Sequence, residues 1–323
     1  MASSPLLAEL RRRFERPGSV RFSEGPGGLV RVVIESGGAE AHVYLHGAHV
    51  THYAPAGRKP LLFTSTRSAF ARDRAIRGGI PIVFPWFGPR AGAPGAPQHG
   101  FARLTEWRVL GVETSDRAAS LVLGLASSDA TRAAWAFDFE VRYRIMVGAG
   151  LDLALEVRNT SAGTVTFEEA LHTYLAVADV TEVTVTGLAG ATYIDKTDGL
   201  KRKRQDAEPV RIAGETDRMY LDTRAACVVD DPPGGRRLVV AKAGSATTVV
   251  WNPWRDKATT IADLGADEWR SMLCIETANA ADDAVTLPPG GRHEMRASIS
   301  EAPYPLSEPR PDGSAAAGRS QRE

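Results

Sequence analysis

The stretch FDFEVRYRIMVGAGLDLALEVRNTS, residues 137–161, decides the fold class of this chain. On both sides of the Gly-Ala-Gly at 148–150, apolar residues alternate with polar or charged ones. Such alternation places the apolar side chains on one face of a β-strand and the polar side chains on the other. A glycine-containing link between two such runs is typical of a hairpin. The stretch therefore predicts a strand, a tight turn and an antiparallel strand.

The same texture recurs along most of the chain. Residues 29–55 carry it on both sides of the Gly37–Gly38 pair, which predicts a second strand–turn–strand unit. Short runs of this kind lie at 119–128, 164–177, 181–188, 227–231, 236–253 and 271–278. They alternate or are rich in β-branched residues, and Gly, Asn, Asp or Pro separates them. Many short strands joined by tight turns are typical of a large antiparallel sandwich or barrel.

Helical periodicity is scarce in this sequence. Residues 4–14 are predicted to form a short amphipathic helix with Ser4 as N-cap and Pro5 at the first helical position, and single helical turns are expected at 129–135 and 263–272. No strand–helix rhythm supports a doubly wound sheet. We therefore predict an all-β fold of antiparallel sheets with few short helices, divided into an N-terminal segment at 1–19, one sandwich domain at 20–302 and a disordered tail at 303–323.

Charge and composition narrow the class of protein. The 323 residues contain 39 Lys plus Arg and 39 Asp plus Glu, so the overall basic excess of a typical nucleic-acid binder is absent. The basic run KRKR at 201–204 is expected to be a solvated turn between strands. The sequence has no run of about twenty apolar residues that would span a membrane, and its N-terminus does not resemble a signal peptide. We expect a cytoplasmic monomer without nucleic-acid or membrane partners.

Four neighbouring histidines invite a metal interpretation. If the segment is a strand, His42 and His46 share one face, while Gly47 is expected to bend the chain before His49 and His52. Metal ligands must converge and usually include carboxylates or thiolates. We interpret the four as half-buried strand residues near a turn and expect no metal. The two cysteines are far apart in sequence and predict neither a disulfide framework nor a metal site.

The segment RGGIPIVFPWFGPRAGAPGAPQHGFAR, residues 77–103, is apolar and rigid. Its prolines and glycines suit a loop that loses little entropy when a ligand binds. A titratable side chain and cations behind an apolar wall are typical of a preformed pocket for a polar ligand. Five arginines gather around this segment: Arg72, Arg74, Arg77, Arg90 and Arg103. They favour a phosphorylated ligand or, alternatively, a solvated rim of salt bridges.

Two polar residues interrupt apolar strand runs further along the chain. His172 lies in FEEALHTYLAV and is either a core histidine bonded to a carbonyl or a functional residue. Glu276 lies in SMLCIETANA, where burying an unpaired carboxylate is costly, so it must face a cleft, a partner or solvent. On neighbouring strands these two would make a general acid/base pair. The sequence does not show that they meet.

Six segments, in their order along the chain, resemble one family. They are RGGIPIVFPWFG, QHGFAR, EEALHTYLAV, GETDRMY, VVWNPW and CIETANA. Together they resemble the glucose-6-phosphate 1-epimerases, or hexose-6-phosphate mutarotases, of the aldose 1-epimerase superfamily, over roughly residues 20–300. The resemblance implies a galactose-mutarotase-like β-supersandwich with a cleft on one concave sheet and neither a metal nor an organic cofactor.

The resemblance also implies roles for seven residues. The general acid falls on His172 and the general base on Glu276. His99 falls on the histidine that hydrogen-bonds the sugar, and Asp217 on a sugar-binding aspartate. The remaining three are expected at sugar hydroxyls, at the 6-phosphate or at the rim of the site: Arg77, Gln98 and Arg103.

These roles imply interconversion of the α and β anomers of a hexose 6-phosphate. An ionised Glu276 would take the proton of the anomeric hydroxyl while a protonated His172 gives one to the ring oxygen, and their attraction is expected to favour this ionic form. Three alternatives stay open: a mutarotase for free aldohexoses, a non-catalytic sugar-binding module, and a hydrolase or lyase that uses Asp217 with Glu276.

Overall fold

A computed structural model describes residues 5–303 of the chain. The predicted hairpin at 137–161 is present as strands β8 (Phe139–Val147) and β9 (Leu151–Asn159). Every second residue of β8 and β9 is buried, as the alternation predicts. The two strands pair antiparallel along their whole length, from Phe139 opposite Asn159 to Val147 opposite Leu151.

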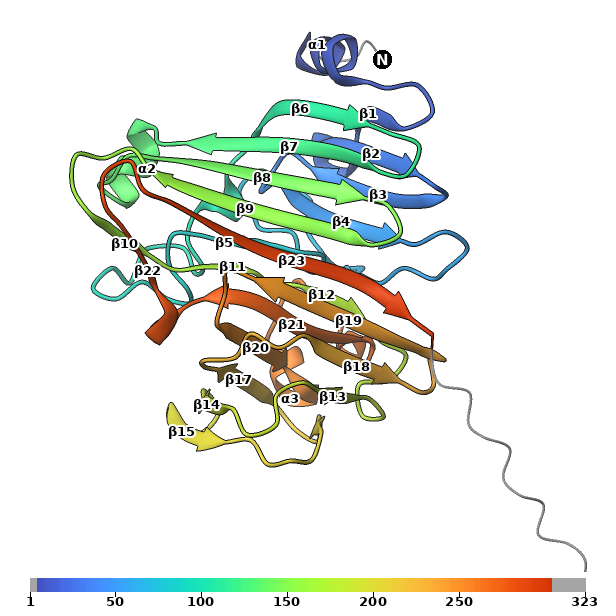
Figure 1. Cartoon of the computed structure of the whole chain (residues 1–323), viewed down its shortest axis with the longest axis vertical. Helices are drawn as coiled ribbons and strands as arrows, with labels where there is room; N and C mark the ends of the chain where they lie inside the picture. Colours follow the sequence, from blue (N-terminus) through green and yellow to red (C-terminus); the bar gives the residue numbers. More distant parts are fainter. Residues whose placement is uncertain (1–4, 304–323) are drawn as a thin grey trace, which may run out of the picture.

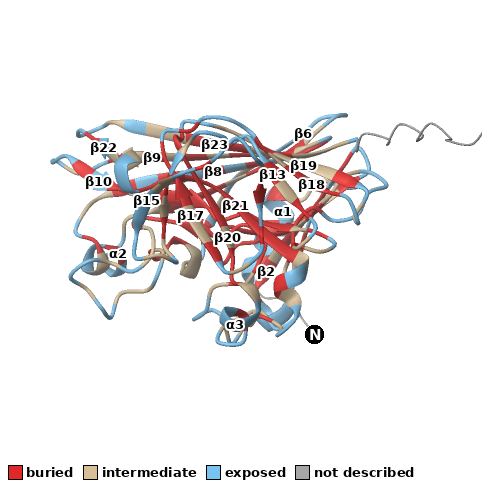
Figure 2. Cartoon of the chain, turned by 90° about the horizontal axis from the view of Figure 1, so that it is seen from below, coloured by how far each residue is buried: buried red, intermediate tan, exposed pale blue. Residues whose placement is uncertain are grey.

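This hairpin lies within a nine-stranded sheet that forms one layer of the molecule (Figure 1). Its strands, in spatial order, are β16 (Val210–Arg211), β13 (Thr184–Thr186), β18 (Cys227–Asp231), β19 (Arg236–Ala243), β23 (Arg292–Ala302), β9, β8, β7 (Ala119–Ala126) and β6 (Arg108–Thr114). Figure 2 shows this sheet edge-on, with the strands of the other sheets beneath it and buried residues between them.

Two further sheets form the second layer. The four-stranded sheet contains β1 (Val20–Glu24), β2 (Val30–Ser36), β3 (Ala39–Tyr44) and β4 (His49–Ala54). The eight-stranded sheet follows the order β15 (Lys201–Arg204), β14 (Thr192–Asp195), β17 (Thr216–Tyr220), β20 (Thr247–Asn252), β21 (Met272–Asn279), β11 (Glu169–Leu171) and β5 (Ile82–Val83), with β12 (Tyr174–Ala176) also on β21. A small pair joins β10 (Val165–Phe167) to β22 (Val285–Leu287).

Few helices accompany these sheets. The helix predicted at 4–14 is present as α1 (Pro5–Phe14), and the turn predicted at 129–135 is α2 (Asp129–Ala134), capped by Ser128. The remaining helical elements are α3 (Trp254–Ala258), which was not predicted, and four 3₁₀ turns: η1 (Pro26–Gly28), η2 (Ala102–Leu104), η3 (Glu268–Ser271) and η4 (Ala281–Asp283). None of the helices within residues 5–303 is long and apolar enough to cross a membrane.

The fold class is therefore the predicted one, and two local expectations are wrong. The KRKR run is not a turn but the edge strand β15, with both of its faces largely exposed, so it lacks the alternation that would mark a strand. The helical turn expected at 263–272 is limited to η3, because Met272 already belongs to β21. The single-domain division stays a prediction, and the tail beyond Pro303 lies outside the described residues.

Candidate active site

One cavity, of about 310 Å³, collects the residues that the sequence singled out. All seven predicted site residues line it: Arg77, Gln98, His99, Arg103, His172, Asp217 and Glu276. Its other lining residues are Phe87, Tyr174, Lys196, Val249, Trp251, Lys257 and Ile261. A larger hollow of about 550 Å³ on the nine-stranded sheet contains no histidine, so the smaller cavity is the candidate site.

The cross-strand register explains why distant residues converge here. Val249 of β20 pairs with Glu276 of β21, and Trp251 pairs with Cys274. Directly opposed residues share a face of a sheet, so this pairing puts Trp251 and Glu276 on the cavity side. Asp217 opposes Trp251 from β17, and Tyr174 opposes Cys274 from β12. The eight-stranded sheet is thus the floor of the site.

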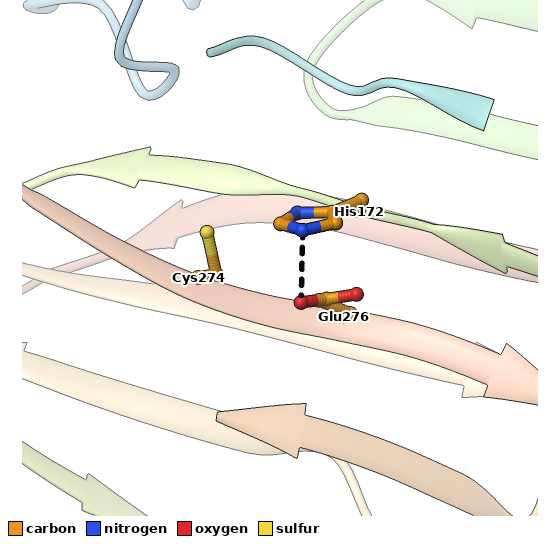
Figure 3. Close-up of side chains that lie close together, drawn as sticks. All are labelled: His172, Cys274 and Glu276. Atoms are coloured by element: carbon orange, nitrogen blue, oxygen red, sulfur yellow. Dashed lines mark ion pairs between the residues drawn. The ribbon is translucent and has the colours of Figure 1, made fainter. Parts of the chain in front are cut away.

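His172 and Glu276 meet at the centre of this floor (Figure 3). Nε2 of His172 lies 3.3 Å from Oε1 of Glu276. Their residues are only 7% and 2% exposed. The other carboxylate oxygen, Oε2, has no hydrogen-bond partner among the described residues. The pair therefore combines a proton donor, a proton acceptor and one free acceptor oxygen at the cavity.

Burial is the largest influence on the protonation of this pair. It raises the pKa of Glu276 well above its usual value. It lowers the pKa of His172 well below its own, and the nearby His99, Arg103 and Arg77 act in the same direction. Desolvation therefore opposes the ionic form that the mutual attraction of the pair is expected to favour. In the neutral arrangement the Glu276 carboxyl holds the one proton that the pair shares, and the His172 imidazole is uncharged.

His99 presents a second imidazole, and burial favours its neutral form. Its backbone has a φ of +62°, which only a fixed turn holds in a residue that is not glycine. The Gly88 N–H donates to Nδ1 of His99 over 3.2 Å, so the ring proton is on Nε2. Burial, followed by Arg103 and other cations, lowers the pKa of His99 to about 3. Its Nε2–H is a hydrogen-bond donor suited to a sugar oxygen.

The two cavity arginines differ in their partners. Arg77 is held by Asp263, 3.1 Å from Nε, and donates from Nη1 to the Tyr174 hydroxyl over 3.0 Å. Arg103 donates from Nη2 to the Gln98 carbonyl over 2.8 Å, and no carboxylate of the described residues pairs with it. Burial lowers the pKa of Arg103 to about 10, which leaves it charged at neutral pH. Arg103 is thus a half-buried cation without a counter-ion.

The other three predicted arginines do not line the cavity. Arg72 forms an exposed ion pair with Glu106, 3.1 Å away. Arg90 lies over the Trp86 ring and contacts the Ala134 carbonyl. The solvated-rim interpretation is therefore correct for Arg72, and the cavity has two further cations that the sequence did not indicate, Lys196 and Lys257.

Lys196 directly follows β14, while Lys257 is paired with Glu215, 3.5 Å away. Nζ of Lys196 lies 3.5 Å from Oδ1 of Asp217 and 4.5 Å from the centre of the Phe87 ring. Burial raises the pKa of Asp217, although Lys196 opposes the shift. Nothing in the local sequence marks Lys196, because it reaches the site through the pairing of β14 with β17.

Aromatic rings complete the floor. The Tyr174 ring stacks on the His172 imidazole at 4.9 Å with an interplanar angle of 12°, and Trp251 meets His172 edge-on at 6.0 Å. Flat apolar rings of this kind suit the face of a sugar ring and fix the imidazole in one orientation. Trp251 shares its face with Val249 and lies in VVWNPW, one of the six segments that resemble the family, so that motif was the available signal for it.

The nitrogen, sulfur and oxygen of His172, Cys274 and Glu276 lie within 4.8 Å of one another (Figure 3). These are ligand types for zinc, although burial raises the pKa of Cys274 well above its usual value and so favours the neutral thiol. The same arginines that lower the pKa of His172 also repel a dication. The trio is better suited to proton transfer than to cation binding.

Comparison with known proteins gives a consistent assignment. A family profile described as "Aldose 1-epimerase" matches residues 30–300. A protein of Cenchrus ciliaris named "Putative glucose-6-phosphate 1-epimerase" is 35% identical over 292 residues, which cover 86% of each chain. An Escherichia coli protein with the same name is 32% identical over 251 residues, 78% of this chain and 83% of that one. The crystal structure of a "putative mutarotase" from Salmonella typhimurium has a TM-score of 0.84 and 28% identity, covering 93% of this chain and all of its own.

Proposed function

The chain belongs to the aldose 1-epimerase family, and on that premise we propose that it interconverts the α and β anomers of a hexose 6-phosphate, with glucose 6-phosphate as the first substrate to test. One observation carries the proposal. A proton-sharing pair, His172 and Glu276 at 3.3 Å, lies in the same cavity as Arg103, a cation that forms no ion pair with a carboxylate of residues 5–303.

Mutarotation needs two proton transfers at the two oxygens bonded to C1: one proton leaves the anomeric hydroxyl, and one reaches the ring oxygen. With the pair in its ionic form, Glu276 takes the proton of the anomeric hydroxyl and His172 gives its proton to the ring oxygen. The C1–O5 bond breaks as C1–O1 becomes a carbonyl, and the open-chain aldehyde forms. Rotation about C1–C2 exposes the other face, and the reverse transfers close the ring on it.

Burial supports this reaction at the intermediate. Ring opening moves the proton from His172 to Glu276 in net terms, so the pair becomes neutral. Because burial favours that neutral arrangement, the site stabilises the open-chain state relative to the ionic starting state. Each positioned proton transfer contributes roughly a hundred- to ten-thousandfold. Substrate hydroxyls that bond to the unpartnered Oε2 of Glu276 favour its ionised form before opening.

The charge of the cavity supports a phosphorylated substrate. Within the described part of the chain no carboxylate forms an ion pair with Arg103, and a phosphate is the dianion that an arginine fork binds through paired hydrogen bonds. Arg77 is already oriented by Asp263 and Tyr174, so it offers a fixed second cation at little entropic cost. In this assignment His99, Asp217 and Gln98 contact the sugar.

The proposal is tested by two-dimensional exchange NMR on glucose 6-phosphate, glucose and galactose, with the uncatalysed rate subtracted. Faster exchange of the phosphorylated sugar supports the proposal. Equal efficiency on glucose would identify a free-aldohexose mutarotase, and binding without faster exchange would identify a sugar-binding module. A product other than the second anomer would identify a hydrolase or lyase.

We also propose that the protein is a cytoplasmic monomer. Its two cysteines are free and buried, which suits a reducing compartment, and a sugar phosphate is an intracellular substrate. Light scattering on the purified protein and fractionation of the source cells test the two parts separately. A stable dimer or an exported protein would contradict them.

A further inference from the structure

Two of the four neighbouring histidines hold backbone beside the cavity, and the proposed reaction does not use them. His46 and His49 are 3% and 0% exposed, so the expectation of half-buried side chains is wrong for both. Nε2 of His46 lies 2.7 Å from the carbonyl oxygen of Arg74, and Nε2 of His49 lies 2.7 Å from that of Gly78. Because a carbonyl oxygen only accepts, both rings donate. We call this pair of histidines the histidine clamp.

The clamp grips both ends of the short segment that contains Arg77. Among the described residues, each of the two carbonyls has its histidine as its only hydrogen-bond donor. Arg77 lies directly before Gly78 and projects from this segment into the cavity. A shift of the clamped backbone therefore moves the guanidinium of Arg77.

The backbone that follows Arg77 needs support of this kind. Gly78 and Gly79 have φ values of +103° and +60°, in the region that favours glycine. A Cβ on Gly79 would lie 2.2 Å from the Val50 carbonyl oxygen and 2.9 Å from Nε2 of His49. The imidazole thus packs directly against bare backbone, where a glycine is required.

A neutral donor is suited to this place. Burial lowers the pKa of His49 to about 3, and the nearby cations Arg103 and Arg77 contribute in the same direction. His49 therefore satisfies the carbonyl without adding or withdrawing charge beside the two arginines. The other two histidines, His42 and His52, are half-buried and do not belong to the clamp. Their rings stack on each other, with 4.8 Å between the ring centres.

We propose that His46 and His49 are positioning residues that fix Arg77 in the cavity and thereby set the affinity of the site for a phosphorylated hexose over an unphosphorylated one. The proposal rests on the proposed function for the identity of the anion. It predicts that loss of the clamp weakens anion binding much more than sugar binding, which a purely structural role would not do.

The test is calorimetric titration of wild type, His49→Leu and His49→Gln with glucose 6-phosphate, glucose and inorganic phosphate. At anomeric equilibrium the titration reports binding without net reaction heat. We expect His49→Leu to weaken binding of glucose 6-phosphate and of phosphate by about tenfold, and that of glucose by less than about twofold. His49→Gln should restore most of the affinity, because its amide N–H donates at a similar reach.

His52→Leu is the matched control, because it removes a histidine from the same strand outside the clamp. It should leave all three affinities within about twofold. If His49→Leu does not fold, His49→Asn replaces it, since the shorter amide does not reach the carbonyl.

Equal losses for all three ligands, or unchanged phosphate affinity in a folded His49 variant, would overturn the clamp proposal. A wild type that binds phosphate but prefers glucose would instead contradict the proposed substrate, while the phosphate titrations still decide the role of the clamp. A wild type that binds neither phosphate nor glucose 6-phosphate would refute both proposals.

Discussion

Replacing Glu276 by glutamine separates the chemistry of the site from its shape. The amide has the size of the carboxylate and keeps one oxygen to accept hydrogen bonds, but it cannot take the proton of an anomeric hydroxyl. Since Oε1 lies 3.3 Å from Nε2 of His172, the substitution also ends proton sharing within the pair. We expect turnover to fall by roughly a hundred- to ten-thousandfold, with sugar binding retained.

The same substitution should stabilise the protein. Burial raises the pKa of Glu276, so between its usual value of 4.5 and its folded value the folded chain holds a proton that the unfolded chain has released. The favourable contribution of the protonated group is thus complete at low pH and declines as the pH rises. Glutamine has no such decline. Glu276→Gln should therefore exceed wild type in stability by about 1–3 kcal/mol near neutral pH, and by less near pH 4.

Glu169, in the same eight-stranded sheet but outside the cavity, offers a matched control. Glu169 of β11 is also fully buried, its pKa is also raised by burial, and Nε2 of His293 lies 3.4 Å from its Oε1. It does not line the cavity. Glu169→Gln should reproduce the gain in stability and change turnover by less than about twofold.

Exchange NMR of glucose 6-phosphate and thermal unfolding from about pH 4 to about pH 8 measure both effects. Near-normal exchange in Glu276→Gln would refute the role of Glu276 as base. An equal loss of turnover in Glu169→Gln would show that burial of a carboxylate, and not its place in the cavity, explains the result.

Three further predictions concern the cations, the backbone and the pH response of the site. Arg103→Gln should lower kcat/KM for glucose 6-phosphate by about 10- to 100-fold, because a charge-assisted phosphate contact is lost, without lowering the melting temperature; an unchanged kcat/KM would contradict the phosphate role. Gly100→Ala should lower the free energy of unfolding, measured by denaturant titration, by more than about 2 kcal/mol. Gly100 has a φ of +72°, and a Cβ there would lie 1.9 Å from the Phe84 carbonyl oxygen. The control Gly95→Ala, whose Cβ would have nothing within 4 Å, should leave that free energy unchanged. Burial lowers the pKa of His99 from 6.5 to about 3, so the unfolded chain takes up the proton first as the pH drops, and stability should fall below pH 6.5. His99→Gln should reduce the slope of melting temperature against pH in this range. An unchanged slope would show that His99 is not buried in its neutral form.

The sequence predicts the sandwich because its strands are half-buried and carry their alternation locally. The hairpin of β8 and β9 is the clearest case, with a strict in-and-out pattern over nine residues in each strand. The same rule fails where a strand has no buried face. At β15 every residue is charged, Arg202 pairs with Asp282, and Lys203 pairs with Asp195 and Asp198, so partners elsewhere in the fold define the strand.

The site could be predicted only in part, for a related reason. The seven residues named from the sequence stand out from apolar or rigid surroundings or match the motifs of a family. Lys196 does neither, and Tyr174 lies in the EEALHTYLAV segment but was not singled out as a site residue. They reach the cavity through the registers of β14 with β17 and of β12 with β21, which join segments far apart in the chain. Because no tight turn joins either pair of strands, the local sequence does not fix their registers.

Some buried side-chain nitrogen and oxygen atoms have no hydrogen-bond partner within residues 5–303. Ten such atoms occur among the described residues, and three of them belong to cavity residues: Arg103, His172 and Glu276. An unpaired buried group is costly, and a better-paired set of side chains would remove that cost. A substrate with hydroxyls and a phosphate can supply the missing partners. The cavity therefore offers three hydrogen-bonding atoms that a bound ligand can pair.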